Sequence, residues 1–193
     1  MRADLLLSDT DEQLMAAVQG GDSSALGELF NRHHAALYRY FLRLSGSAAL
    51  SEDLTQDVFL RMLRRGETWQ PDARFTSWMY RIAHNAFIDH TRRSKWETAM
   101  PEKMDIPAPA GRQLEQDEEH ALLHRALLLL PPDKRELLVL SRFQGLKYEQ
   151  IGELLDVETN TVKVRVFRAL GQLREIYERL SGRPGLFAVG GRN

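Results

Sequence analysis

Apolar residues recur at helical spacing through most of this chain, and signals for β-strands are nearly absent. The clearest example follows Pro71, where the apolar positions are spaced i, i+3, i+4, i+7, i+8, i+11 and i+12. This spacing places them on one face of an α-helix. Asn-Gly and Asp-Gly hairpin turns and alternating apolar runs do not occur. The sequence therefore predicts an all-α protein with this stripe in its core: Phe75, Trp78, Met79, Ile82, Ala83, Ala86 and Phe87.

A proline-rich stretch interrupts the helical pattern near the middle of the chain. Residues 100–111 hold three prolines and a glycine and show little apolar periodicity, which is typical of a linker. The chain has 193 residues, of which 43% are hydrophobic, enough for two small cores. We predict two small helical domains at 10–95 and 119–181, joined by a flexible acidic linker over 96–118 and followed by a flexible tail over 182–193.

Several helix ends have sequence signatures. Thr10-Asp-Glu-Gln13 fits a capping box, and Gly20-Gly21-Asp22 ends that helix and opens the next. Ser51, followed by two acids, predicts a second helix start, since acids favour the positive end of the helix dipole. Pro131-Pro132-Asp133 opens a helix that runs toward Gly145.

The net charge of −1 conceals two basic segments. Residues 74–95 carry five basic residues and one acid, and residues 159–174 carry four basic residues and no acid. Between them, residues 96–124 carry seven acids and two basic residues. Each basic segment predicts a phosphate-binding surface, and the alternative for each is an ordinary solvated helix face.

The first basic segment carries an asparagine among arginines. Arg81, Asn85 and Arg92 share the helix face opposite the apolar stripe. The paired donor and acceptor of an asparagine can read the edge of a base that has left the stack. Trp69, in the polar loop before this helix, is interpreted either as an exposed stacking platform for bases or as a loop anchor tucked against the domain.

The helix from Ser51 to Arg64 is mixed in character. Leu54, Val58 and Met62 share one face, and Phe59 sits between this face and the rest of the helix. The rest of the helix carries Asp53, Gln56, Asp57, Leu60, Arg61 and Arg64, a mixed apolar and charged surface. Such a surface suits docking onto a partner helix, whereas a solvated helix with pairs such as Asp57–Arg61 is the alternative.

The second basic segment lies in a predicted helix-turn-helix. Residues 146–155 form a short helix in which Gly152 allows close approach, and residues 156–159 form a turn. The next helix exposes basic residues near its N-terminus, the end that enters a major groove in this motif. The alternative is a helical hairpin with a basic solvent face. Core positions of the second helix are Val162, Val166, Ala169, Leu170 and Leu173, and its outward or border positions are Asn160, Lys163, Val164, Arg165, Phe167 and Arg168.

Enzymatic and metal chemistry have weak support. The chain has no cysteine, no Gly-rich phosphate loop, no Gly-x-Ser-x-Gly and no His-Glu-x-x-His. His120 and His124 stand at i, i+4, but the acidic helix end around them explains the pair without a metal. We predict no catalysis, cofactor or metal. The apolar run at the start is too short for a signal peptide, so we expect a soluble, cytoplasmic protein.

Taken together, the sequence resembles bacterial RNA polymerase sigma factors of the extracytoplasmic-function group, which keep two helical domains called regions 2 and 4. The resemblance runs from Asp11 to about Leu180. It rests on Asp53-Leu-Thr-Gln-Asp-Val-Phe59, on Arg74-Phe-Thr-Ser-Trp-Met-Tyr-Arg-Ile-Ala-His-Asn85, on Leu146-Lys-Tyr-Glu-Gln-Ile-Gly152 and on Thr161-Val-Lys-Val-Arg-Val-Phe-Arg-Ala169.

The resemblance implies an alternative sigma factor that binds core RNA polymerase, directs it to specific promoters and helps to capture the melted minus-ten strand. It implies docking on the clamp coiled coil of the largest polymerase subunit through Asp53, Gln56, Asp57, Phe59 and Arg61. It implies minus-ten binding by Trp69, Gln70, Asp72, Arg74, Arg81, Asn85, Arg92 and Arg93, with the loop and Asn85 holding a flipped base. It implies that the minus-thirty-five element is bound by Asn160, Lys163, Val164, Arg165, Phe167 and Arg168. An anti-sigma factor is an expected partner, and the free protein is expected to be a monomer.

The sequence departs from the family pattern at three positions in the helix-turn-helix. Lys147 replaces a common Ser or Thr cap, Asn160 a common glycine, and Val164 a common serine. Two alternative functions remain: a conventional helix-turn-helix regulator with a helical partner-binding N-terminal domain, which binds only duplex DNA, and a protein-interaction protein that binds no DNA.

Overall fold

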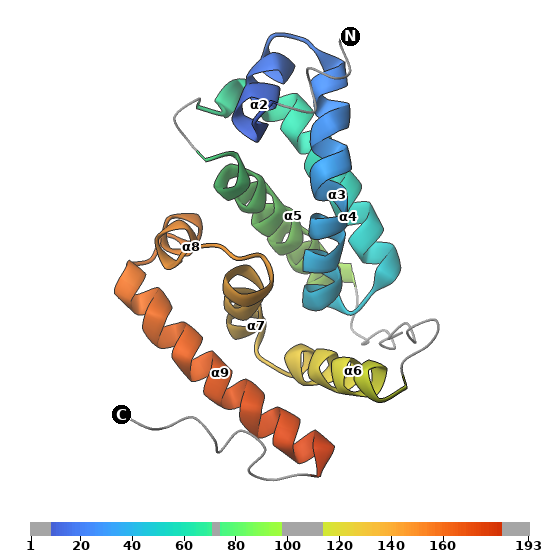
Figure 1. The fold of residues 1–193 in the computed structure, drawn as a ribbon, viewed down its shortest axis with the longest axis vertical. Helices are drawn as coiled ribbons and strands as arrows, with labels where there is room; N and C mark the ends of the chain where they lie inside the picture. Colours follow the sequence, from blue (N-terminus) through green and yellow to red (C-terminus); the bar gives the residue numbers. More distant parts are fainter. Residues whose placement is uncertain (1–8, 71–73, 98–113, 183–193) are drawn as a thin grey trace. The chain divides into compact units, whose positions relative to one another are not determined.

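A computed structural model of the chain describes residues 9–70, 74–97 and 114–182. Every regular element in these ranges is a helix, and no strand occurs within them (Figure 1). The helices fall into two compact units, one holding α2 to α5 and the other α6 to α9. The all-α prediction is thus confirmed.

The described residues of the first unit form four α-helices and a short 3-10 turn. They are α2 (Asp11–Gln19), α3 (Ser23–Ser45), α4 (Ala48–Arg65), η1 (Gly66–Thr68) and α5 (Phe75–Glu97). Helices α4 and α5 pack against each other, and α2 contacts both η1 and α5 (Figure 1). The predicted α5 stripe is buried except for the half-buried Trp78. It packs with the apolar faces of the other helices, whose buried members include Leu14, Met15, Leu29, Leu37, Phe41, Val58 and Met62.

One predicted helix start is confirmed and another is wrong. The Thr10–Gln13 capping box is present: the Gln13 amide donates to Thr10 Oγ1 at 3.2 Å, and the Thr10 amide donates to Gln13 Oε1 at 2.7 Å. Ser51 does not cap α4, because the helix already begins at Ala48 with Ser47 as its N-cap. Ser51 is instead fully buried and donates its hydroxyl to the Ser47 carbonyl at 2.6 Å.

The second unit contains α6 (Leu114–Leu128), α7 (Pro132–Leu138), the π-helical turn η2 (Val139–Phe143), α8 (Tyr148–Leu155) and α9 (Thr159–Ser181). Helix α9 contacts α6, α7 and α8 (Figure 1). The predicted start of α7 at the proline pair is confirmed. Helix α6 begins at Leu114, inside the stretch expected to be linker, while most of that linker and residues 183–193 of the expected tail lie outside the described residues.

The turn between α8 and α9 requires a glycine one turn before it. A Cβ on Gly152 would lie 2.6 Å from the Val157 carbonyl oxygen, closer than real contacts allow. Asp156 has a left-handed conformation with φ of 56°, which brings the Val157 amide to the Gly152 carbonyl at 2.9 Å. The predicted close approach at Gly152 is therefore confirmed.

Candidate DNA-binding and partner-binding surfaces

The solvent face of α5 carries the polar residues that the sequence predicts there. Arg81 and Asn85 are exposed one helical turn apart, on the side away from the buried Met79 and Ala83. Arg74, Arg92 and Arg93 are also exposed. This face can contact phosphates along its length, and Asn85 offers one donor and one acceptor to a base edge.

The one acid on this face, Asp89, is held by arginines. Its carboxylate lies 2.9 Å from Arg61 of α4 and 3.4 Å from Arg92. The hydrogen bond from Arg61, together with the nearby positive charges, holds the pKa of the Asp89 carboxyl below its usual value. The negative charge of Asp89 is offset by these arginines, so it does little to weaken the attraction of this face for phosphate groups.

Trp69 is not an exposed stacking platform. Its side chain is 1% exposed, so the structure shows the loop-anchor alternative. Trp69 follows η1 directly, and its backbone amide donates to the Gly66 carbonyl at 3.1 Å. Gln70 and Arg74 are exposed, and Asp72 lies outside the described residues.

Helix α2 holds both described ends of this loop, a role that the sequence analysis missed. The side-chain amide of Gln19 donates to the carbonyls of Gly66 and Trp69 at 2.7 and 3.0 Å. At the other end, the Phe75 amide donates to Glu12 Oε1 at 3.1 Å. No sequence pattern reveals these contacts, because they join residues 47 to 63 positions apart.

The exposed face of α4 differs from the predicted docking set. Asp53 and Gln56 are exposed, but Phe59 is 6% exposed and packs on Phe30 with ring centroids 4.9 Å apart. Phe59 is thus corrected from a surface residue to a core residue. Leu60 and Leu63, 50% and 53% exposed, are large apolar side chains on the surface of α4.

Helical spacing could have identified this stripe. Residues 53, 56, 60 and 63 stand at i, i+3, i+7 and i+10, whereas Phe59 shares the core face with Met62. Asp57 and Arg61 are partly buried in the predicted ion pair, at 2.8 Å.

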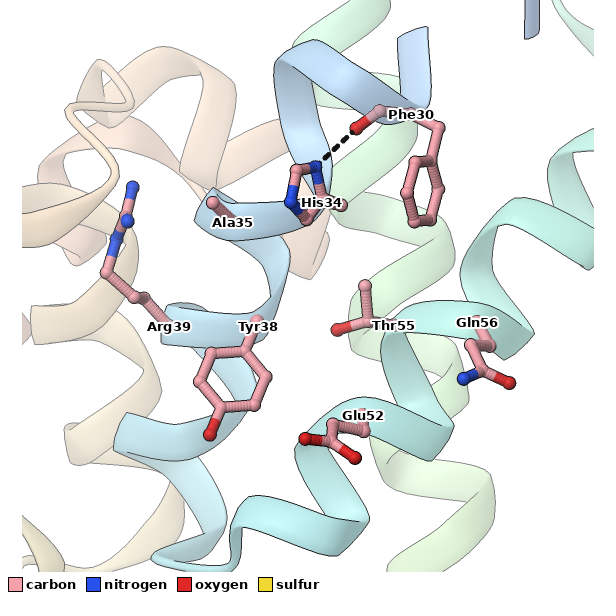
Figure 2. A pocket seen from close by; sticks show the side chains of 8 residues that line it. All are labelled: Phe30, His34, Ala35, Tyr38, Arg39, Glu52, Thr55 and Gln56. Carbon is pink, nitrogen blue, oxygen red and sulfur yellow. Dashed lines mark hydrogen bonds between the residues drawn. The ribbon is translucent and has the colours of Figure 1, made fainter. Parts of the chain in front are cut away.

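A groove of ≈ 480 Å³ runs between α3 and α4 beside this stripe (Figure 2). Phe30, His34 and Tyr38 border it from α3, and Thr55 and Gln56 border it from α4. The His34 ring stacks on Phe30 with centroids 4.8 Å apart, and its Nδ1 donates to the Phe30 carbonyl at 2.8 Å. The groove therefore has a fixed aromatic wall and a polar rim at Gln56.

The first half of α9 exposes the residues predicted to face DNA. Val162 and Val166 are buried, and all six predicted contact residues are exposed. Two of them are apolar: Phe167 is 79% exposed and Val164 is 49% exposed. Large apolar side chains at the N-terminal half of a recognition helix suit contacts with thymine methyl groups.

The described residues offer neither a metal centre nor a membrane-spanning helix. They contain no group of three or more His, Asp or Glu arranged to hold a metal ion. Among the helices that they form, none is long and apolar enough to cross a membrane.

Known protein families match both units. Residues 29–97 match the family model for sigma-70 region 2, and residues 120–173 match the model for sigma-70 region 4. In solved structures, the sigma factor RpoE of Bartonella quintana, determined in complex with the anti-sigma factor NepR, has a similar fold. Its TM-score is 0.66 at 24% identity, over 79% of this chain and 96% of that one.

Curated relatives place the chain more narrowly. It is 40% identical to the ECF RNA polymerase sigma factor SigE of Mycolicibacterium smegmatis over 80% of its own length, and the match spans 63% of that longer relative. It is 32% identical to the ECF RNA polymerase sigma factor SigM of Mycobacterium tuberculosis over 86% of this chain and 84% of that protein. The chain therefore belongs to the extracytoplasmic-function (ECF) group of the sigma-70 family of RNA polymerase sigma factors.

Proposed function

We propose that this sigma factor is a non-catalytic subunit that docks on the clamp coiled coil of core RNA polymerase, directs it to specific promoters and captures the melted minus-ten strand. The observation that carries strand capture is the exposed Asn85 on the basic face of α5. A regulator that reads only duplex DNA has no need of a base-reading amide on that helix.

In the minus-ten region, Asn85 reads the edge of an unpaired base, and Gln70, Asp72 and Arg74 complete the pocket from the preceding loop. Arg81, Arg92 and Arg93 hold the strand by its phosphates. The buried Trp69 contributes by fixing the start of the loop, since its ring is covered and offers no face to a base.

In the core-docking region, Asp53, Gln56, Leu60 and Leu63 form the contact stripe on α4. The partner is a helix that places an apolar side chain in the groove beside Gln56 and polar side chains against Asp53. Phe59 supports this surface from beneath by packing on Phe30, and Asp57 and Arg61 stiffen it through their ion pair.

In the minus-thirty-five region, Lys163 and Arg168 reach base edges or phosphates, Arg165 reaches phosphates, and Asn160 lies at the start of the helix. Val164 and Phe167 supply apolar contacts. The working compartment is the cytoplasm, where polymerase is found. An anti-sigma factor that covers the polymerase-binding and DNA-binding surfaces completes the proposal, and the free chain is a monomer.

Size-exclusion chromatography of the chain with core RNA polymerase tests the proposal. We expect wild type to co-elute and a Gln56→Ala, Leu60→Ala double variant to lose co-elution. Both substitutions lie on the exposed face of α4, so the domain should stay folded, which circular dichroism checks. Phe59 is unsuitable for this test, because its removal would leave a cavity.

Val164→Ala is the matched control, since it also truncates an exposed apolar side chain but lies on α9. It should co-elute like wild type. A folded wild-type chain that fails to co-elute would favour the duplex-binding regulator instead. Equal co-elution of wild type and the double variant would refute docking through α4.

A further inference from the structure

Helix α2 contacts the residues on both sides of the loop that joins η1 to α5, here called the minus-ten loop. Gln19 lies at the C-terminal end of α2 and Glu12 at its N-terminal end. Gln19 binds the carbonyls of Gly66 and Trp69, where the loop leaves α4, and Glu12 accepts the Phe75 amide, where α5 begins. One short helix therefore spans the two described ends of the segment that joins α4 to α5.

Glu12 accepts a backbone amide that local structure leaves open, whereas Gln19 adds a second donor to the Gly66 carbonyl, which already accepts the Trp69 amide. The Phe75 amide belongs to the first turn of α5, where no earlier carbonyl of the same helix can accept it. A carboxylate at that position also interacts favourably with the positive end of the α5 dipole. Gln19 uses its two amide hydrogens on two carbonyls three residues apart, which fixes the turn at η1.

Apolar packing holds α2 itself in place. Leu14 and Met15 are fully buried, and a Cβ on Gly66 would lie 3.2 Å from the Met15 methyl. On its outer side, the Asp11 carboxylate accepts from His33 at 2.8 Å and from Arg32 at 3.2 Å, which ties α2 to α3. Because α2 is fixed to the body of the domain, its contacts with the loop are fixed as well.

We propose that Gln19 and Glu12 are positioning residues for minus-ten recognition: α2 acts as a clamp that holds Trp69 and Phe75, next to the exposed Gln70 and Arg74, in a fixed position relative to Asn85. This inference rests on the proposed function. Without the clamp, the domain would still bind core polymerase and phosphates, but Gln70, Arg74 and Asn85 would no longer be held together for the flipped base.

The test compares two isosteric changes on the same helix. Gln19→Glu replaces the amide donors with a carboxylate that faces two carbonyls. Gln13→Glu is the matched control, because Gln13 serves as an acceptor for the Thr10 amide and glutamate can accept the same bond. Holoenzymes made from core polymerase and each variant are incubated with a pool of random single-stranded DNA 12-mers, and the retained DNA is quantified and sequenced.

We expect wild type and Gln13→Glu to enrich the same short motif. For Gln19→Glu we expect co-elution with core polymerase and total retained DNA within about twofold of wild type, while enrichment at the most selective position falls roughly tenfold, the discrimination of one base-edge contact. A merely structural defect would lower all three readouts together. Unchanged enrichment by Gln19→Glu would overturn the clamp.

A second pair of variants covers the case in which Gln19→Glu does not fold. Glu12→Gln keeps an acceptor for the Phe75 amide and should retain selectivity, whereas Glu12→Ala removes it and should lower selectivity. Equal selectivity of these two variants would count against the clamp. If the wild-type holoenzyme enriches no motif, strand capture itself is wrong, and the clamp falls with it.

Discussion

The guanidinium of Arg61 lies 2.9 Å from the carboxylate of Asp89, so the helix proposed to dock on polymerase also neutralises the one acid on the basic segment of α5. The same guanidinium lies 2.8 Å from Asp57. The two candidate surfaces of this unit are therefore electrostatically connected through one side chain.

This connection predicts a defined dependence of stability on pH. The hydrogen bond from Arg61 lowers the pKa of Asp89 below the unfolded value of about 3.9. A depressed pKa gives stabilisation that is complete above the unfolded value and is lost as the pH falls through the folded one. The difference in unfolding free energy between wild type and Asp89→Asn should thus be constant from pH 5 to 7 and shrink below about pH 4.

Urea unfolding followed by tryptophan fluorescence measures this difference, because all three tryptophans lie between residues 69 and 96 and report on the first unit. In an Arg61→Ala background the pH dependence should weaken but not vanish, because Arg92 stays beside Asp89, and the coupling energy between Arg61 and Asp89 at pH 7 should be about 0.5–1 kcal/mol, as for other partly exposed ion pairs. If the pH dependence were the same with and without Arg61, it would come from another ionisable group.

Truncation of two neighbouring residues on α4 should change the unfolding free energy by very different amounts. Phe59→Ala should lower the unfolding free energy by about 3 kcal/mol, because it removes a buried ring that packs on Phe30. Leu60→Ala should change it by less than about 0.5 kcal/mol, since half of that side chain is already in water. The same urea titration measures both changes. Equal losses would mean that α4 does not bury Phe59 and expose Leu60 as described.

The start of α8 should be stabilised by a better cap. Gln150 Oε1 accepts the Lys147 amide at 2.9 Å, which is one half of a capping box, but the lysine side chain makes no cap bond and places a positive charge at the positive end of the helix dipole. Lys147→Ser completes the box and should add about 1 kcal/mol. Amide hydrogen exchange in α8 measures the gain, and Lys147→Ala, which removes the charge alone, should give less than half of it.

Alanine substitutions at two glycines of the second unit should change its stability in opposite directions. Gly152→Ala places a methyl group against the Val157 carbonyl and should cost about 2–3 kcal/mol, with loss of duplex binding as the turn distorts. Gly171→Ala meets nothing within 4 Å inside α9 and should stabilise by about 0.5–1 kcal/mol. Thermal unfolding followed by circular dichroism gives both values, and a stable Gly152→Ala variant would contradict the described turn.

Phe167 should contribute to promoter selectivity through thymine. In duplexes selected from a random pool by the wild-type holoenzyme, Phe167→Ala should lower affinity about tenfold at fixed salt. Replacing the selected thymines by uracil removes their methyl groups and should weaken wild type but not Phe167→Ala. Leu129→Ala, which truncates an exposed apolar side chain outside α9, should leave affinity unchanged in anisotropy titrations.

The all-α character of the chain and the exposed faces of α5 and α9 could be predicted from the sequence alone. These properties follow from the spacing of neighbouring residues: Met79, Ala83 and Ala86 on one side of α5, and Arg81 and Asn85 on the other, are placed by the helical repeat alone. The same is true of the Thr10 capping box, which joins residues three apart.

Which aromatic residues are covered, and what holds the ends of the loop before α5, depends on tertiary packing. Trp69 could equally have faced water, and Phe59 stood next to the exposed Leu60, until the packing of α2, α3 and α4 settled both. The bonds from Gln19 and to Glu12 join residues far apart in the chain, and no local pattern specifies such partners. Side-chain orientation within a helix is a local property, whereas burial of a loop and the satisfaction of its backbone groups depend on which distant helix the fold brings against it.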